Sequence, residues 1–314
     1  MLSRRLLRVK VMQMVYAFNK RGDVSIQEME KELFHSISKS YELYHYLLLL
    51  ITDIHAHAVN RIEKGKSKKI PSPADLNPNT RFIDNKLLLQ LATNPHMLQY
   101  QEDSGISWAN NADVIRSVYK QVIESNLYED YMELGTTTYD EDKKFIVKLV
   151  EKVIAQYEPL YAQIEEQSIF WNDEAEFIVS MVIKTVKEFE EERGDKQVFQ
   201  NEFKDADDKD FVARLFRKSL LNQKEFVALI KKYAQNWDLD RVAYMDIVLM
   251  QIALSEILEF PNIPVKVSLN EYIELAKHYS TPKSSLFING ILDKVVEHLK
   301  TEGRVIKSGR GLVE

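Results

Sequence analysis

The chain contains no cysteine, and it has only nine glycines and eight prolines in 314 residues. Without cysteine there can be no disulfide, no thiolate metal site and no cysteine nucleophile. Few glycines and prolines leave few places where a helix must end, and long stretches repeat apolar residues with the helical period. The strongest apolar run, Leu47–Ile51, is far shorter than the ~20 residues that span a bilayer. An all-α protein without a transmembrane helix is therefore predicted.

The motifs of common enzyme and cofactor sites are also missing. The sequence has no GxxxxGK[ST], GxGxxG or HExxH motif, which removes the commonest phosphate, dinucleotide and zinc signatures. His55 and His57 stand two residues apart, which on a helix points them to nearly opposite sides. We therefore predict no catalysis, no cofactor and no metal site. The lack of cysteine fits a reducing cytoplasm, where we expect the protein to be located.

Positive charge is concentrated in two segments, although the net charge is −6. The first 21 residues hold six basic side chains and no acidic one, and residues 61–69 read RIEKGKSKK. The stretch from Glu188 to Asp210 is instead rich in acids. Binding to a nucleic acid, if it occurs, should therefore be local and should not cover the whole surface.

Two places carry the serine-x-x-glutamate pattern of a capping box. Ser25 is followed by Glu28, and Ser268 by Glu271, each ahead of residues with helical periodicity. In such a box the hydroxyl and the carboxylate each bind a backbone N–H of the first turn. The pattern predicts that helices begin at both serines.

A second helix is expected soon after the one that starts at Ser268. Thr281 is followed by Pro282, and a hydroxyl residue ahead of proline is a favoured opening for a helix. The join between the two helices gathers polar and aromatic side chains. Two well-capped core helices are one interpretation, and a functional site at the join is the other.

Three stretches of this chain resemble the NusB family of bacterial transcription antitermination factors. The C-terminal one reads KVSLNEYIELAK followed by FINGILDK. Upstream, DRVAYMDIVLMQIALSEI (Asp240–Ile257) is similar to the family's central helix, and RRLLRVKVMQMVYAF (Arg4–Phe18) to its arginine-rich first helix. The resemblance covers roughly residues 1–35 and 208–300.

This resemblance implies an all-α, NusB-like helical bundle with an inserted helical region. Residues 1–40 would supply the arginine-rich helix and a second helix, and residues 208–300 the C-terminal core. Residues 41–207 would form the insertion, and residues 301–314 a flexible basic tail.

The insertion shows an internal similarity to the C-terminal core. Nine residues within 142–183 recur unchanged 66 positions later, within 208–249, as Phe145 and Phe211 do. Self-similarity at one offset is typical of a repeated supersecondary unit. Two interpretations stay open: a diverged duplication, and two amphipathic helix pairs alike only in pattern.

The family resemblance also implies a function. It implies binding of a short single-stranded element in ribosomal RNA leaders, with a small-subunit ribosomal protein as heterodimer partner, within the antitermination complex of RNA polymerase. Single-stranded RNA requires cations that face phosphates and rings on which bases stack. The candidate RNA-binding residues of this chain are Arg4, Arg5, Arg8, Tyr16, Tyr279, Lys283 and Phe287, of which Tyr279 and Phe287 match aromatic positions of the family.

Several of these residues also have a structural interpretation: the arginines as a solvated helix face and Phe287 as part of the core. The chain departs from the family at Leu6, where the family carries an arginine, and at Lys283, where it often carries an acid.

Asp246 is the candidate contact for the protein partner. It matches an acidic position of the family, and we expect it to be exposed on a helix that starts near Arg241, where it would suit a basic ribosomal protein. An alternative from another class is a helical interaction scaffold that has lost RNA binding.

Overall fold

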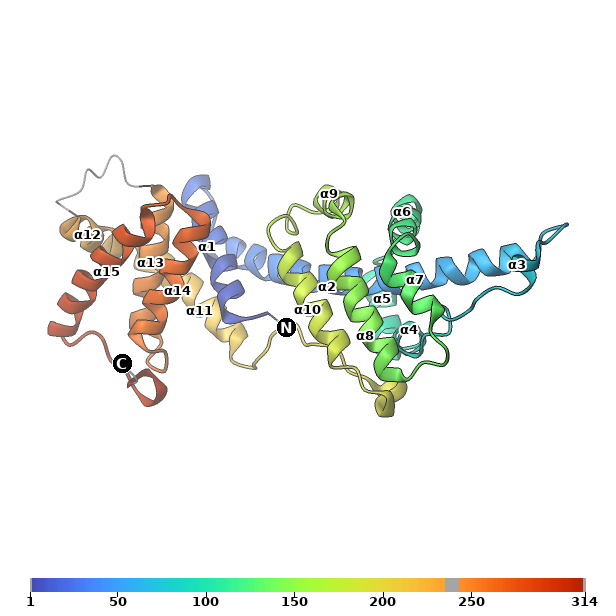
Figure 1. The fold of residues 1–314 in the computed structure, drawn as a ribbon. Helices are drawn as coiled ribbons and strands as arrows, with labels where there is room; N and C mark the ends of the chain where they lie inside the picture. Colours follow the sequence, from blue (N-terminus) through green and yellow to red (C-terminus); the bar gives the residue numbers. More distant parts are fainter. Residues whose placement is uncertain (1, 235–242, 313–314) are drawn as a thin grey trace. The chain divides into compact units, whose positions relative to one another are not determined.

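The computed structural model describes residues 2–234 and 243–312 and divides into two compact units (Figure 1). We call Leu2–Ile37 together with Phe203–Glu314 the terminal unit, and Ser38–Glu202 the insertion unit. Within the described residues every regular element is a helix, and the β-structure is limited to one bridge between Leu2 and Phe203. The predicted all-α fold is confirmed.

The terminal unit is built around one buried helix, α13 (Tyr244–Glu259). Nearly every side chain of α13 from Asp246 to Ile257 is buried, because α1, α11, α12, α14 and α15 all pack against it. A helix that is apolar on all sides belongs in a core. The other helices are α1 (Arg4–Arg21), the first turns of α2 (Ile26–Lys66), α11 (Asp208–Leu221), α12 (Gln223–Tyr233), α14 (Val265–Tyr279) and α15 (Ser284–Thr301), followed by the short η5 (Gly309–Leu312).

The insertion unit packs shorter helices around α8 (Tyr139–Leu149), which contacts α4, α7 and α10. Its elements are the rest of α2, α3 (Pro73–Leu76), α4 (Lys86–Ala92), α5 (Pro95–Ser104), η1 (Ala109–Asn111), α6 (Ala112–Ile123), α7 (Asn126–Glu133), the π-helical turn η2 (Val150–Ile154), α9 (Glu158–Gln167), α10 (Ala175–Lys187) and η3 (Glu191–Lys196). Among the described residues no helix is both long and apolar enough to cross a membrane.

Helix α2 belongs to both units, since the division after Ile37 falls inside it. It starts as predicted: the Glu28 carboxylate accepts a hydrogen bond from the Ser25 backbone N–H, and the Ser25 hydroxyl accepts one from the Glu28 N–H. This capping box is confirmed.

The segment expected to be a flexible tail makes specific contacts. The Lys307 ammonium donates hydrogen bonds to the carbonyls of Ile257 and Phe260, at the end of α13. The Ser308 backbone N–H donates to the Pro261 carbonyl. Residues 307–308 therefore cap exposed carbonyls at a helix end.

The helices of the two internally similar ranges follow the same order. α12 ends at Tyr233, and 66 positions earlier Gln167 ends α9. The first helix of each range packs against the third helix of that range and against an earlier helix of its unit: α11 against α13 and α1, and α8 against α10 and α4. Trp237, one of the nine recurring residues, lies outside the described residues. The duplication stays a prediction that these bounds support.

Candidate functional site

The arginines of α1 are all engaged by carboxylates from the terminal unit. Arg4 donates to Asp208 at 2.9 Å, and Arg5 donates two hydrogen bonds to Glu271 at 2.8 and 2.9 Å. Arg8 donates two to Glu256, at 2.7 and 2.8 Å. Such bidentate pairs fix both position and orientation of the guanidinium.

The Arg8–Glu256 pair lies at the centre of a buried polar network. Their side chains are 4% and 0% exposed. Glu256 also accepts hydrogen bonds from the Ser268 hydroxyl at 2.8 Å and the Tyr272 hydroxyl at 2.9 Å. Burial lowers the pKa of Arg8, but the hydrogen bonds and the charge of Glu256 more than offset this and leave that pKa above its ordinary value.

The same burial, followed by the charge of Glu256, raises the pKa of Tyr272 well above its ordinary value, so Tyr272 stays a neutral donor. The prediction that Arg8 contacts RNA is therefore wrong in this structure. The Arg8 charge is neutralised inside the fold by Glu256 on α13, and Glu256 in turn accepts a hydrogen bond from Ser268 on α14.

Arg4 and Arg5 keep part of their surface in solvent, 40% and 58% respectively. Hydrogen bonding from Arg5 lowers the pKa of Glu271, so this carboxylate remains charged and neutralises its partner. The flank of α1 that the sequence presents as a row of free cations is, in the structure, a row of ion pairs.

The join between α14 and α15 is organised by Asp246. Its carboxylate accepts hydrogen bonds from the Ser280 hydroxyl at 2.5 Å and the Ser284 hydroxyl at 2.9 Å. Asp246 is 3% exposed. The expectation that Asp246 lies on the surface and contacts a protein partner is therefore wrong, because the two serines draw it inside. Arg241, where that helix was expected to start, lies outside the described residues.

One of the two helix starts predicted at the join is shifted. Helix α14 begins at Val265, so Ser268 lies within the helix and gives its hydroxyl to Glu256 instead of capping. Helix α15 begins at Ser284, soon after Thr281 and Pro282, as predicted. The cap at Ser268 is therefore corrected by a contact from a distant part of the chain, and the helix opening after Thr281 is confirmed.

The remaining predicted residues of the join differ in exposure. Phe287 is 5% exposed and belongs to the core, which corrects its predicted role as a stacking ring. Tyr279 is half-buried. Lys283 is exposed, and among the described residues the structure records no ion pair for it.

A partly exposed pair of tyrosine rings, with Tyr16 exposed and Tyr244 half-buried, lies where the end of α1 meets the start of α13. Tyr16, 36% exposed, meets Tyr244 edge to face with ring centroids 5.6 Å apart. The Lys20 ammonium lies 4.3 Å from the centroid of the Tyr244 ring and 5.7 Å from that of Tyr16. The sequence pointed to Tyr16 but missed the other two residues. The four-residue spacing of Tyr16 and Lys20 on one helix was the available signal.

This ring pair and the helix join lie at the same end of α13. Tyr244 and Asp246 both stand in its first turn, whereas Glu256 comes ten residues later, about 15 Å along the axis. Apart from Phe287, which lies in the core, the predicted residues thus separate into two groups. Tyr16, Tyr279 and Lys283 gather near the start of α13, and the arginines pair with carboxylates away from it.

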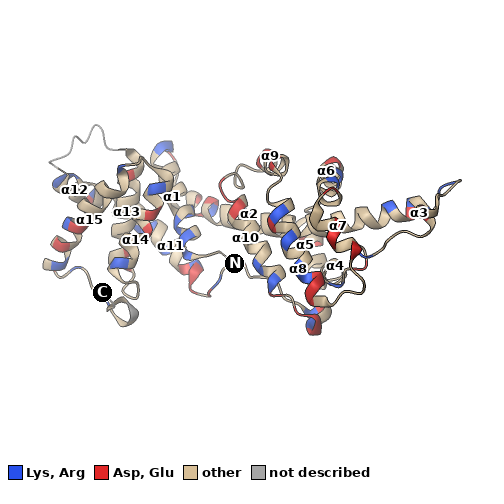
Figure 2. Cartoon of the chain, viewed as in Figure 1, with Lys and Arg blue, Asp and Glu red and all other residues tan. Residues whose placement is uncertain are grey.

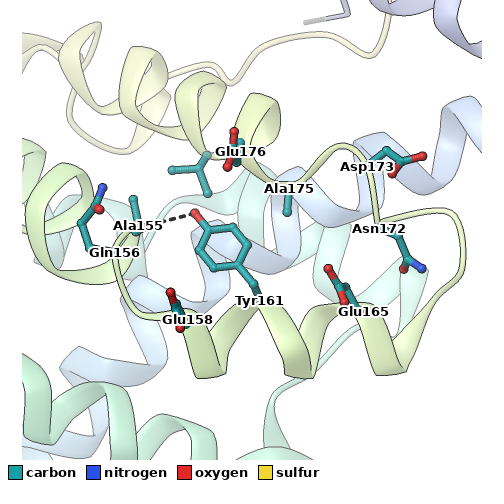
Figure 3. A pocket seen from close by; sticks show the side chains of 10 residues that line it. Ala155, Gln156, Glu158, Tyr161, Glu165, Asn172, Asp173, Ala175 and Glu176 are labelled. Atoms are coloured by element: carbon teal, nitrogen blue, oxygen red, sulfur yellow. Dashed lines mark hydrogen bonds between the residues drawn. The ribbon is translucent and has the colours of Figure 1, made fainter. Parts of the chain in front are cut away.

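A cleft of about 820 Å³ in the insertion unit has a different character (Figure 3). Its polar lining includes the carboxylates of Glu158, Glu165, Asp173 and Glu176, and the Tyr161 hydroxyl donates to the Ala155 carbonyl. Such a lining repels phosphates. Within the described part of the chain, no three His, Cys, Asp or Glu side chains are arranged to hold a metal ion.

Comparison with known proteins gives consistent matches. A family model described as the NusB family matches residues 174–297. The transcription antitermination protein NusB of Salinibacter ruber is 43% identical over 109 residues, which is 35% of this chain and 68% of that protein. NusB of Chloroherpeton thalassium is 47% identical over 106 residues, 34% of this chain and 50% of that protein.

Two further matches carry the same name. NusB of Natranaerobius thermophilus is 40% identical over 89 residues, 28% of this chain and 64% of that protein. A solved structure of T. maritima NusB is 26% identical and covers 44% of this chain and 84% of that one, with a TM-score of 0.28.

Proposed function

Because the chain belongs to the NusB family, we propose that it acts in transcription antitermination by binding a single-stranded RNA through its terminal unit. The observation that carries the RNA surface is the pair formed by the exposed Tyr16 ring and the half-buried Tyr244 ring, with the exposed Lys20 beside it. Unstacked bases lie on exposed rings, and a neighbouring ammonium attracts the phosphate between them.

The proposed surface extends from this ring pair to the α14–α15 join. Lys283 supplies a second exposed cation there, and Tyr279 a half-buried ring. The Asp246–Ser280–Ser284 contacts hold the join rigidly against the start of α13, so the surface is positioned before RNA arrives. A pre-positioned surface loses less entropy on binding.

The proposed RNA is an element of a ribosomal RNA leader, and the proposed partner is a small-subunit ribosomal protein within the RNA polymerase antitermination complex. Both follow from the family resemblance. Since Asp246 is buried, the partner has to use other residues of the terminal unit.

Fluorescence anisotropy with a labelled leader RNA and a scrambled RNA, each with and without the ribosomal protein, tests this proposal. We expect the leader RNA to bind more tightly than the scrambled one, and more tightly still with the partner. The Tyr16→Ala variant should bind leader RNA about tenfold to a hundredfold more weakly, since loss of one stacking ring costs about 1–3 kcal/mol.

Tyr233→Ala is the matched control, because Tyr233 is another half-buried tyrosine with a lysine, Lys232, 5.3 Å from its ring centroid, but on α12. The control should leave RNA affinity unchanged.

The scaffold alternative has one observation in its favour, the neutralisation of Arg4, Arg5 and Arg8 by carboxylates. It predicts equal or absent binding of leader and scrambled RNA with the partner present, and it predicts no effect of Tyr16→Ala. That result would contradict the RNA-binding proposal and leave the fold unaffected.

A further inference from the structure

We propose that the insertion unit carries a second, sequence-independent RNA-binding surface where the C-terminal end of α2 meets α6. Its cations are Arg61 and Lys64 on α2 and Arg116 and Lys120 on α6, all exposed. This inference goes beyond the proposed function, which concerns the terminal unit alone.

The two helices are brought together by aromatic contacts. The His57 and Tyr119 rings meet with centroids 5.0 Å apart, and the Arg61 guanidinium lies 5.7 Å from the Tyr119 ring centroid. On α2, His57, Arg61 and Lys64 follow the i, i+4, i+7 spacing that places them on one side of the helix. Cations from both helices therefore face the same region of solvent.

The charge of this surface is uncompensated at its centre. No ion pair is recorded within the described residues for Arg61, Lys64 or Arg116, and Lys120 meets Glu124 only at 3.7 Å with both side chains more than half exposed. Around the helix, Glu63 lies about 160° from Arg61 and about 100° from Lys64. Asp113 is on the same side of α6 as Arg116, without a recorded contact.

The positive charge of this surface also acts on His57, whose ring lies between the two helices. Burial, and then the charges of Arg61, Arg116 and Lys64, lower the pKa of His57. All three of these charges are positive. The surface continues into the end of α2 and the segment after it, where Lys66 and Lys69 are exposed and Lys68 is bound by Asp75. Figure 2 shows basic residues in blue along the end of α2 near α3.

The partner with matching chemistry is an RNA backbone. From His57 to Lys66 the helix rises about 14 Å, enough for its cations to meet successive phosphates of one strand. A guanidinium held against a ring, as Arg61 is, presents a fixed fork to a phosphate. A membrane-binding helix needs a continuous apolar face, whereas Val59 and Ile62 beside these cations are half-buried in the unit.

Fluorescence anisotropy of the full chain with a labelled single-stranded RNA of scrambled sequence tests the inference. The variant is Arg61→Gln/Lys64→Gln/Arg116→Gln. Its matched control is Lys152→Gln/Lys184→Gln/Lys187→Gln, which removes the same charge from other exposed sites of the insertion unit. We expect the first variant to lose about tenfold or more in affinity and its log–log salt slope to become shallower by about 2, and the control to match the wild type.

The outcome is separable from the proposed function. The first variant should weaken leader and scrambled RNA by the same factor, so selectivity between them is kept, whereas Tyr16→Ala should reduce that selectivity. NMR of the His57 ring gives an independent readout: scrambled RNA should shift its signals and raise its pKa. Loss of leader selectivity with a scrambled-RNA affinity that still depends on Arg61, Lys64 and Arg116 would contradict the proposed function and support this inference.

Three results would overturn the inference. One is an affinity for scrambled RNA that is unchanged in the Arg61/Lys64/Arg116 variant, and another is a His57 ring that does not respond to RNA. The third is binding to phosphatidylserine vesicles, with the same dependence on the three cations, in place of RNA binding.

Discussion

In the terminal unit a cation lies in the core, whereas the insertion unit buries no lysine or arginine among its described residues. Arg8 and Gln90 show the difference. Arg8 is the fifth residue of α1, which packs against α11. Gln90 is the fifth residue of α4, which packs against α8. Arg8 pairs with the buried Glu256, while Gln90 donates to the carbonyls of Glu190 and Gly194.

The two arrangements teach how buried polarity is stabilised. The neutral Gln90 amide group finds its hydrogen-bond partners within the insertion unit. Its N–H groups bind backbone carbonyls, and its oxygen accepts a hydrogen bond from the Tyr139 hydroxyl. A buried guanidinium needs a carboxylate, and the one it finds is 248 positions away in the chain. A buried ion pair stabilises the fold little more than well-packed apolar residues would, but removing one of its two partners strongly destabilises the fold. We infer that it fixes the packing of α1 on α13.

The largest expected effect comes from breaking this charged pair. Arg8→Gln leaves Glu256 buried without its counter-charge, and we expect the free energy of unfolding of the terminal unit to fall by about 3–5 kcal/mol. Urea unfolding followed by circular dichroism measures it. Arg8→Gln/Glu256→Gln copies the neutral arrangement of the insertion unit and should recover part of the loss. A double variant as unstable as the single one would contradict the pairing argument.

The insertion unit should respond to pH through a buried histidine. Burial lowers the pKa of His45 from 6.5 to about 4, and the ring stacks on Tyr100 with centroids 3.6 Å apart. Between pH 6.5 and 4 the unfolded chain binds a proton that the folded unit does not, so stability falls as the pH falls. The loss should approach about 3 kcal/mol at pH 4.

Urea unfolding of wild type and His45→Gln at neutral and acidic pH tests this second prediction. The variant should lose the histidine's share of the pH dependence, whereas His278→Gln, an exposed site in the terminal unit, should behave like wild type. An unchanged pH dependence in His45→Gln would show that other groups carry it.

Asp246 should have an intermediate effect. Asp246→Ala leaves the Ser280 and Ser284 hydroxyls without their acceptor, and we expect a loss of about 2 kcal/mol in the free energy of unfolding. Asp246→Asn keeps one acceptor oxygen and should cost less. If Asp246→Asn instead left stability intact and abolished binding of the ribosomal protein, the surface role given to this residue by the sequence would be restored.

The smallest effect is expected at the exposed pair of Arg5 and Glu271. Arg5→Gln should change the free energy of unfolding by less than about 1 kcal/mol, and the difference should shrink in high salt. Its affinity for leader RNA should stay near that of wild type, because Glu271 already neutralises the charge. A large fall in RNA affinity would place Arg5 back among the RNA contacts.

The two capping-box patterns show which parts of the fold the sequence could predict. Ser25 and Glu28 find only each other, so the local motif decides and the helix starts where expected. Ser268 and Glu271 have the same spacing, but Glu256 and Arg5 reach them from distant parts of the chain and take over their polar groups. Local pattern therefore predicts helix content well and fails where tertiary partners compete.

The candidate site follows the same rule. The sequence grouped Arg8 and Tyr16 as candidate RNA contacts, but it does not reveal that Arg8 pairs with a buried carboxylate and that Tyr16 meets a second tyrosine ring. Asp246 was expected outside because a lone acid on a helix is most often solvated. The hydroxyls that draw it inward belong to the next helix join, 34 and 38 positions later.

The division of α2 between the units has a consequence for how the protein is made. The ribosome delivers α1 and the first turns of α2 early, but their packing partners begin only at Phe203, after the whole of Ser38–Glu202 has emerged. The insertion unit is contiguous and can fold during this delay. During this delay the apolar residues that α1 later buries are exposed to solvent. Arg8 also lacks its partner, because Glu256 is synthesised 248 residues later. Until its partners are made, α1 is therefore the part of the terminal unit that is exposed to aggregation.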